Sequence, residues 1–233
     1  MSEALRRRAG EAWAFRARVE HEAALRFARL AEAIAGFDAE SPIPALLRRA
    51  ADDERRHEDL CADLAQQYGQ AAAGKGEDAA IAPAGLDRRS AALYEMVAAC
   101  CITETESMAT LASLLEGPAD PTVEKVLREI ARDEVVHGRM GWAHLAREAA
   151  RSDVGFLSRW IPSMLSGTVG DDLFSAVDEE LEASGLLRLG VLPHSMKRRI
   201  FIGTLDGVVL PGLEKFGVDP EPARAWLAAR RAG

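Results

Sequence analysis

DEVVH at residues 133–137 and DERRH at residues 53–57 share one pattern, in which an Asp and a Glu are followed, after two further residues, by a His. The Glu and the His of such a stretch stand three residues apart, so on an α-helix they lie on the same face. The chain contains only five histidines. We therefore interpret the two stretches as the two halves of one dinuclear metal site.

The composition favours helix almost throughout the chain. Ala, Leu, Arg and Glu dominate, whereas aromatic residues make up only 6%, and these are the proportions of an all-α protein. A length of 233 residues leaves room for one domain of about 150 residues and an extension. The net charge of -8 is spread along the chain, which argues against nucleic acid or an anionic membrane as a partner.

The three cysteines do not form a pattern typical of disulfide-bonded or zinc-binding proteins. Cys100 and Cys101 are adjacent, Cys61 stands alone, and no C-x-x-C occurs, so neither a disulfide framework nor a rubredoxin-type site is indicated. The first residues lack the apolar region of a signal peptide, and no apolar run is long enough for a membrane helix. We expect a cytoplasmic protein.

Apolar residues at steps of three and four predict four long helices in the first part of the chain. These helices span about residues 3–35, 44–69, 87–116 and 121–150. Between the second and the third, residues 69–85 are rich in Gly and Ala and show no periodicity, which indicates a linker. Its length suffices to carry the chain back along the bundle, so we expect a long crossover between these two helices.

After residue 151 the pattern changes to shorter helices separated by Gly and Pro. We expect them at about residues 153–165, 171–184, 193–209 and 220–231. The sequence therefore predicts a four-helix bundle over residues 1–151 and a C-terminal helical extension over residues 152–233 that packs on it.

Each of the four long helices carries an acidic residue or a Glu-x-x-His pair near the middle of its apolar face. The six residues are Glu20, Glu54, His57, Glu104, Glu134 and His137. Four carboxylates buried together without counter-charges would cost many kcal/mol, so the layer requires cations. Carboxylates with one imidazole for each metal suit Fe(II) or Mn(II). The phase of the apolar face favours Glu20 over Glu22 and Glu104 over Glu106.

Over roughly residues 3–150 the chain resembles the ferritin-like di-iron carboxylate superfamily. Those bundles take one Glu from each of two helices and a Glu-x-x-His from each of the other two. The resemblance implies two bound iron ions, with an Fe/Mn pair as the alternative. It implies that Glu20 and His57 are terminal ligands of one iron and that Glu104 and His137 are terminal ligands of the other. Glu54 and Glu134 would be the bridging carboxylates.

The same resemblance implies a role for the Asp that begins each stretch. In relatives of the oxygenase and ribonucleotide reductase type, this Asp accepts the free N–H of the opposite ligand His. Asp53 and Asp133 match that position. The physical need is general, because a ligating imidazole must have its tautomer and orientation fixed by a second acceptor.

Four further side chains are candidates for the lining of a pocket beside the metals: Cys61, Cys101, Met108 and His144. Cys61 lies one turn after the first ligand His, where a reductase of the radical type carries a tyrosine, so a radical-storing subunit is not indicated. The plainer alternative is a small buried residue that fills space. We expect His144 to be a hydrogen-bonded core or pocket residue, and Gly138 and Gly141 to mark close packing or room for a small molecule.

Three functions fit this pattern. The leading hypothesis is an oxidase or oxygenase that uses O2 on a small organic substrate. The alternatives are a ferroxidase or iron-handling protein, and a bundle in which the metals serve only folding. No reductase motif is attached, so an electron donor would be a separate molecule. Residues 152–233 could close the substrate side, add a structural layer or form a homodimer interface, and the sequence does not decide among these.

Overall fold

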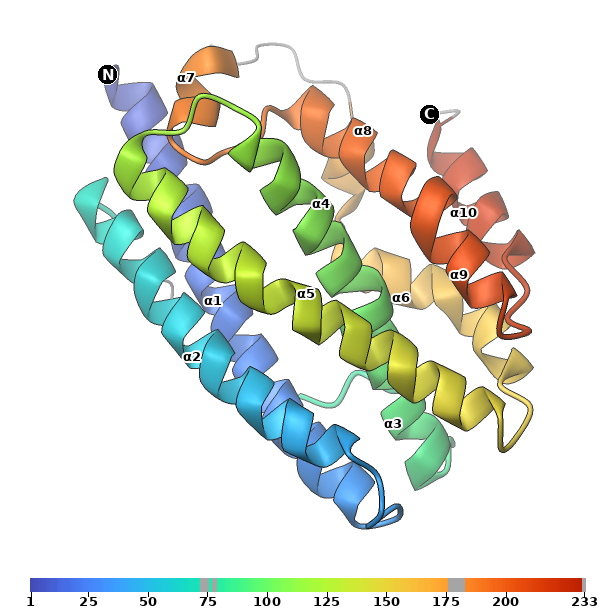
Figure 1. The fold of residues 1–233 in the computed structure, drawn as a ribbon. Helices are drawn as coiled ribbons and strands as arrows, with labels where there is room; N and C mark the ends of the chain where they lie inside the picture. The colour runs from blue at the N-terminus through green and yellow to red at the C-terminus, as the bar shows by residue number, and fades with distance from the viewer. Residues whose placement is uncertain (72–75, 77–78, 176–182, 232–233) are drawn as a thin grey trace.

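The computed structural model describes residues 1–71, 76, 79–175 and 183–231, which are helical apart from turns and connections. The all-α prediction is confirmed. Figure 1 shows four long segments packed side by side as a bundle. They are α1 (Glu3–Ala35), α2 (Ile43–Gln67), a third segment made of α3 (Arg88–Met96), a π-helical turn (Val97–Thr103) and α4 (Glu104–Leu115), and finally α5 (Pro121–Ala149).

Local sequence sets the ends of the bundle helices. The Ser2 side chain accepts a hydrogen bond from the Leu5 backbone N–H at the start of α1, and Asp87 caps α3 through Arg89 and Ser90. Proline lies in the first turn of α2 and of α5, where its missing N–H costs nothing. Among the described residues, no helix combines the length and the apolar character needed to cross a bilayer.

The third segment differs from the single helix that the sequence predicts. Residues 97–103 form a π-helical turn between α3 and α4, which changes the rotational phase of the residues before it relative to those after it. Within this turn the Thr103 hydroxyl donates to the Ala98 carbonyl at 3.0 Å, so a carbonyl displaced from the α-helical pattern is satisfied.

The ends of α2 and α3 lie at opposite ends of the bundle. The Arg6 guanidinium lies 3.5 Å from the carbonyl of Gln67 at the end of α2. Arg88, the first residue of α3, lies beside Gly36 at the far end of α1. The predicted linker between them includes residues 72–75 and 77–78, which lie outside the described residues, so the path of the crossover stays a prediction.

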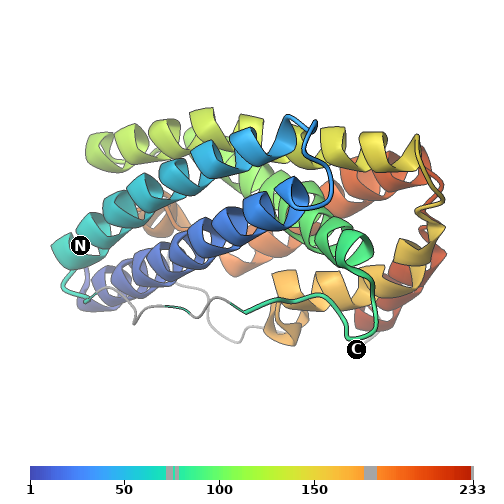
Figure 2. The same cartoon turned by 90° about the horizontal axis from the view of Figure 1, so that it is seen from below.

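The C-terminal region forms short helices, of which α7 (Ala183–Arg188) packs against the start of α1 and the others lie on the α3 and α4 side of the bundle (Figures 1 and 2). They are two 3₁₀ turns (Gly155–Trp160, Asp171–Phe174), α6 (Ile161–Thr168), α7, α8 (His194–Thr204), a second π-helical turn (Leu205–Val209), α9 (Leu210–Glu214) and α10 (Glu221–Arg231). Of the predicted helix at 171–184, residues 176–182 lie outside the described residues.

One large apolar cluster joins this region to the bundle. It contains Leu93, Val97 and Leu145 from the bundle together with Leu165 and Trp226 from the extension. Since the cluster crosses residue 151, the extension packs on the bundle through a shared core. The division of the chain into two domains stays a prediction.

Two smaller clusters fill the bundle interior on either side of its middle. One surrounds Phe27 and Leu47, and the other surrounds Trp13 and Leu127. The first cluster takes residues 23–34 from α1, residues 43–51 from α2 and residue 140 from α5. The second takes residues 13–17 from α1, residues 61–65 from α2 and residues 123–130 from α5. A layer between the two clusters remains, and the polar site occupies it.

Candidate metal centre

The layer in the middle of the bundle is made of buried polar side chains from α1, α2, α4 and α5. Their exposed fractions are 8% for Glu20, 0% for Glu54 and His57, 6% for Glu104, 1% for Glu134 and 0% for His137. The structure thus brings together all six residues that the sequence singled out. Four carboxyl groups in one apolar interior are unstable as bare anions.

The six side chains divide into two overlapping groups, each able to hold one metal ion. Within a group, every residue offers a ligand atom that lies within 4.8 Å of the others. The groups are Glu20, Glu54, His57 and Glu134, and Glu54, Glu104, Glu134 and His137. Glu54 and Glu134 belong to both groups, which is the position of carboxylates that bridge two ions.

Both imidazoles turn Nδ1 toward the carboxylates of the layer. His57 Nδ1 lies 3.3 Å from Glu54 Oε2, and His137 Nδ1 lies 3.2 Å from Glu134 Oε2. His137 Nδ1 also lies 2.9 Å from Glu54 Oε1, although that oxygen has no partner with hydrogen-bond geometry among the described residues. A short contact without hydrogen-bond geometry fits an oxygen and a nitrogen that share a cation.

The outer ring nitrogens point to the Asp residues of the opposite stretch. His57 Nε2 lies 3.2 Å from Asp133 Oδ2. His137 Nε2 lies 3.5 Å from Asp53 Oδ2, at the limit of hydrogen-bond distance. Each Asp therefore faces the His across the bundle, as the resemblance implies. The hydrogen bond to Asp133 would place the proton of His57 on Nε2 and leave its Nδ1 free to bind a metal, whereas His137 Nε2 has no hydrogen-bond partner among the described residues.

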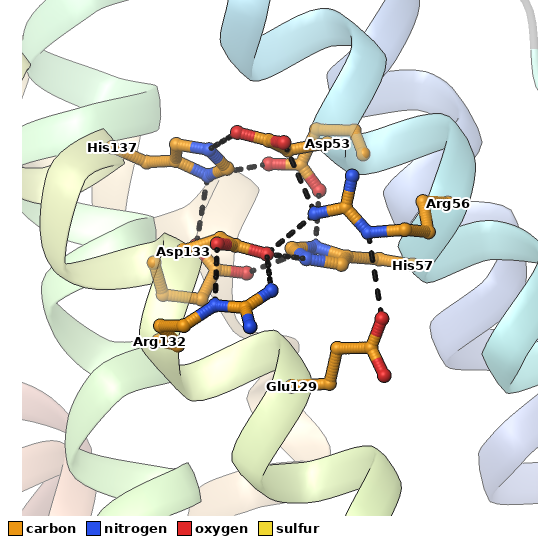
Figure 3. A network of polar contacts seen from close by, with 9 residues as sticks. Asp53, Arg56, His57, Glu129, Arg132, Asp133 and His137 are labelled. Atoms are coloured by element: carbon orange, nitrogen blue, oxygen red, sulfur yellow. Dashed lines mark hydrogen bonds and ion pairs between the residues drawn. The ribbon is translucent and has the colours of Figure 1, made fainter.

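Arg56 joins these two Asp residues and was not singled out from the sequence. Its Nη2 donates to Asp133 Oδ2 at 2.6 Å and to Asp53 Oδ1 at 3.0 Å. Figure 3 shows the guanidinium between the two stretches, with Glu129 near its Nε and Arg132 beside Asp133. Burial raises the pKa of Asp133, but hydrogen bonds from Arg132, His57 and Arg56 outweigh this and lower it to about 2.

The carboxylates of the layer repel one another. Burial, together with the charge of Glu54, raises the pKa of Glu20 well above its usual range, and burial with Glu134 does the same to Glu104. Burial and Glu54 also raise the pKa of Glu134 to about 7. A layer of this kind requires positive charge, either from protons or from metal ions.

The carboxylates of the layer also favour the charged form of one imidazole. Burial disfavours the charged form of His137, yet its contacts with Glu134 and Glu54 raise its pKa to about 12. The same contacts overcome the burial of Glu54 and lower the pKa of that carboxyl to about 2. Two divalent ions fit this site, because they would supply the charge that protons otherwise supply. Carboxylate and imidazole donors without thiolates suit iron or manganese.

Comparison with protein families places this geometry in a known group. The rubrerythrin family model matches residues 14–144, a segment that includes all six residues of the layer and covers more than half of the chain. The chain belongs to the rubrerythrin family. This is a ferritin-like di-iron carboxylate family, so the superfamily resemblance is confirmed. A search of curated proteins found no match.

Within the rubrerythrin-type bundle, two cysteines lie near the layer, and one of them was not predicted. Cys61 is fully buried, and burial with the charge of Glu20 raises its pKa. Cys101 instead packs in the apolar cluster shared with the extension. Cys100 takes the position near the layer, where burial and the charge of Glu104 raise its pKa. The π-helical turn explains the exchange, because it alters the helical phase on which the prediction for Cys101 depended.

Gly141 allows α5 of the rubrerythrin-type bundle to approach this π-helical turn. A Cβ atom at Gly141 would lie 2.3 Å from Cys100 Cβ and 3.1 Å from the Cys101 backbone nitrogen. At Gly138 a Cβ atom would meet nothing nearer than the Cys100 carbonyl oxygen at 3.9 Å. Of the two alternatives for these glycines, close packing applies to Gly141.

The other two predicted pocket residues lie on either side of the layer. Met108 is half-buried on α4. His144 is 1% exposed, and neither ring nitrogen has a hydrogen-bond partner among the described residues. His144 is thus a core residue, as one alternative expected, and its hydrogen bonding stays a prediction. Burial lowers its pKa to about 4, so this histidine is neutral in a neutral solution.

Proposed function

We propose that this rubrerythrin-family protein binds two iron ions and uses them to activate O2 for the oxidation of a small organic substrate. The observation that supports it most directly is the pair of ligand groups that share Glu54 and Glu134. When bound, two Fe(II) ions supply the electrons for O2 reduction. The remaining chemistry, which the protein provides, is to position ligands, to exclude water and to control protons.

The residues of the layer would divide these tasks. Glu54 and Glu134 would bridge the two ions, while Glu20 with His57 and Glu104 with His137 would bind them from the sides. Asp133 would keep the proton of His57 on Nε2, and Asp53 lies opposite His137 Nε2 at 3.5 Å. The apolar clusters above and below, with the Phe27 ring edge-on to His137 at 5.7 Å between centroids, would keep bulk water from the site.

The alternative within the same family is a ferroxidase, for which iron itself is the substrate. The ferritin-like bundle supports both functions. The extension favours an organic substrate, because it adds helices along the α4 side of the bundle that metal binding by the layer does not require. Its other proposed roles, an added structural layer or a homodimer interface, remain compatible with either function.

Iron stoichiometry during turnover distinguishes the two functions. The protein is loaded anaerobically with two Fe(II) per chain, mixed with O2 and then given excess Fe(II). We expect rapid oxidation to stop at about two irons per chain until a reductant is added. Continuous oxidation of many irons per chain would show a ferroxidase. Two variants form a matched pair. Glu104→Gln should lose the reaction. Glu22→Gln should keep it, because the Glu22 carboxylate pairs with Arg18 on the outside of α1.

A further inference from the structure

The π-helical turn over residues 97–103 leads directly into a residue of the metal layer. Glu104 follows Thr103, and its backbone N–H donates to the Ala99 carbonyl, five residues earlier. The backbone of Glu104 is therefore held by the π-helical pattern itself. An α-helix turns by about 100° per residue, so a return of this turn to α-helical pairing would rotate Glu104 relative to α3 by about one such step. The direction of the Glu104 carboxylate thus depends on what keeps the turn in place.

Two parts of the C-terminal extension contact this turn. They are α6 and the second π-helical turn, over residues 205–209. Val97 and Ala98 of the first turn share the large apolar cluster with Leu205 and Val209 of the second. Apolar contact has no direction, so it does not by itself favour π-helical over α-helical pairing.

A contact between two hydroxyl groups adds direction to this interface. Thr103 Oγ1, at the end of the turn, lies 3.1 Å from Thr168 Oγ1, at the end of α6. The Thr103 oxygen also lies 3.0 Å from the Ala98 carbonyl, and the Thr168 oxygen lies 3.1 Å from the Met164 carbonyl. Both threonines are half-buried. The two side chains therefore link α6 to a carbonyl inside the π-helical turn.

The number of hydroxyl hydrogens gives this link its direction. Each hydroxyl has one hydrogen and two acceptor positions, so two hydroxyls fully satisfy only two of the three contacts. Met164 lies four residues before Thr168 on α6, where the helical backbone already supplies its carbonyl with a partner. The consistent arrangement is that Thr168 donates to Thr103 and Thr103 donates to the Ala98 carbonyl. A donor from the extension thus supports a bond within the turn.

We propose that Thr168 is a positioning residue for Glu104, through which the extension sets the affinity of one metal position in the layer. This inference rests on the proposed function, because it takes Glu104 as a metal ligand. Thr103 and Ala98 are five residues apart, and residues with this spacing do not face each other on an α-helix. The bond that Thr168 supports therefore favours the π-helical turn over a continuous α-helix. Thr168 would act through Thr103 and the backbone, without touching a metal ion.

The two metal positions should respond differently to this residue. Glu104 belongs to one ligand group, whereas the other group takes its unshared ligands, Glu20 and His57, from α1 and α2. The π-helical turn belongs to neither of those helices. Loss of the Thr168 hydroxyl should therefore weaken one metal position and leave the other unchanged. A residue that served only packing would alter stability without selecting one metal position.

Stepwise anaerobic binding of Fe(II) to the metal-free protein, measured by calorimetry, tests this role. Thr168→Val keeps the shape of the side chain and loses its hydroxyl. We expect one of the two iron affinities to fall about fivefold, as loss of one hydrogen bond implies, and the other to stay. Thr168→Ser keeps the hydroxyl and should bind as wild type does. Ser166→Ala is the matched control, because the Ser166 hydroxyl of the same helix accepts from the Trp226 indole within the extension.

A double variant shows whether Thr168 acts through Thr103. Thr103→Val alone should weaken the same metal position to a similar extent. Addition of Thr168→Val to it should cause no further loss of affinity, since residues that act in one chain are not additive. Denaturation of each metal-free variant is measured in parallel, so that a change in stability is separated from a change in metal affinity.

Several outcomes would overturn the proposal. These are an equal loss at both metal positions, no loss at either, Thr168→Ser or Ser166→Ala as weak as Thr168→Val, and additive losses in the double variant. If Thr168→Val does not fold, Thr168→Ala also lacks the hydroxyl and should show the same loss at one position. A wild type that fails to bind two Fe(II) ions would contradict the proposed function instead.

Discussion

At the scale of single residues, the two halves of the site are tied together from outside the metal layer. Arg56 contacts Asp53 and Asp133, and each Asp faces the imidazole of the other stretch. One guanidinium therefore holds both carboxylates that face the two histidines. Outer contacts of this kind govern metal affinity although they never touch the metal.

Replacement of Arg56 should weaken metal binding without unfolding the bundle. In Arg56→Gln both Asp residues lose their shared donor, so we expect a metal affinity lower by about tenfold. The neighbouring Arg55→Gln is the matched control, because Arg55 is exposed and pairs with the exposed Asp52. Anaerobic titration with Mn(II) compares the two. Equal affinities in the two variants would show that Arg56 has no part in positioning the site.

The pKa values of the layer predict how the metal-free protein responds to pH. The folded state raises the pKa of Glu134 from 4.5 to about 7 and that of His137 from 6.5 to about 12. In both cases the folded state binds more protons than the unfolded state, so stability falls as pH rises above 4.5. The lowered pKa of Glu54, about 2, acts only below that range. The lowered pKa of His144, about 4, opposes the trend below pH 6.5, but it is one group against the two raised ones.

We therefore expect the melting temperature of the chelator-treated protein to be lower at pH 8 than at pH 5.5. Added Mn(II) should restore it more at pH 8, where fewer protons compete with the metal. Glu134→Gln removes one of the titrating groups and should flatten the pH dependence. A melting temperature that rises from pH 5.5 to pH 8 without metal would contradict this view of the layer.

At the scale of the elements, the π-helical turn between α3 and α4 is the feature that sequence periodicity did not predict. Periodicity assumes 3.6 residues per turn, and a π-helical turn breaks that rule. The turn brings Cys100 rather than Cys101 to the layer, and it meets α5 at Gly141. The π-helical turn therefore occurs where α5 approaches the third segment closely.

Two glycines of α5 offer a matched test of this contact. Gly141→Ala would place a Cβ atom 2.3 Å from Cys100 Cβ, so we expect a destabilisation of about 1–3 kcal/mol. Gly138→Ala meets only atoms at 3.9 Å and beyond and should stabilise the helix by up to about 1 kcal/mol. Chemical denaturation of the metal-free variants measures both. Equal stabilities would mean that the packing of α5 on the π-helical turn is loose.

At the scale of the whole molecule, the sequence predicted the parts of the site that depend on helical periodicity. The six side chains of the layer were found because each lies on the apolar face of its helix at matching depth, and the two stretches share one spacing. Arg56 and Cys100 were missed. Their environment depends on contacts between helices far apart in sequence, which periodicity within one helix does not encode.

The C-terminal extension contacts the bundle in more than one place. It shares a core with α3 and α5, and Leu189 anchors Trp13 on α1. The extension thus contacts the bundle at α1 as well as at α3 and α5, whereas the layer itself is made by residues of the bundle.

The central claim is that the middle layer binds two metal ions through Glu54 and Glu134 in common. Anaerobic equilibrium dialysis against Fe(II) tests it, with metal counted per chain in wild type, Glu54→Ala, His137→Ala and the outer-face control Glu22→Gln. We predict two irons per chain in wild type and Glu22→Gln, fewer than one in Glu54→Ala, and about one in His137→Ala. Failure of the wild type to bind iron, or two irons retained in Glu54→Ala, would contradict the claim.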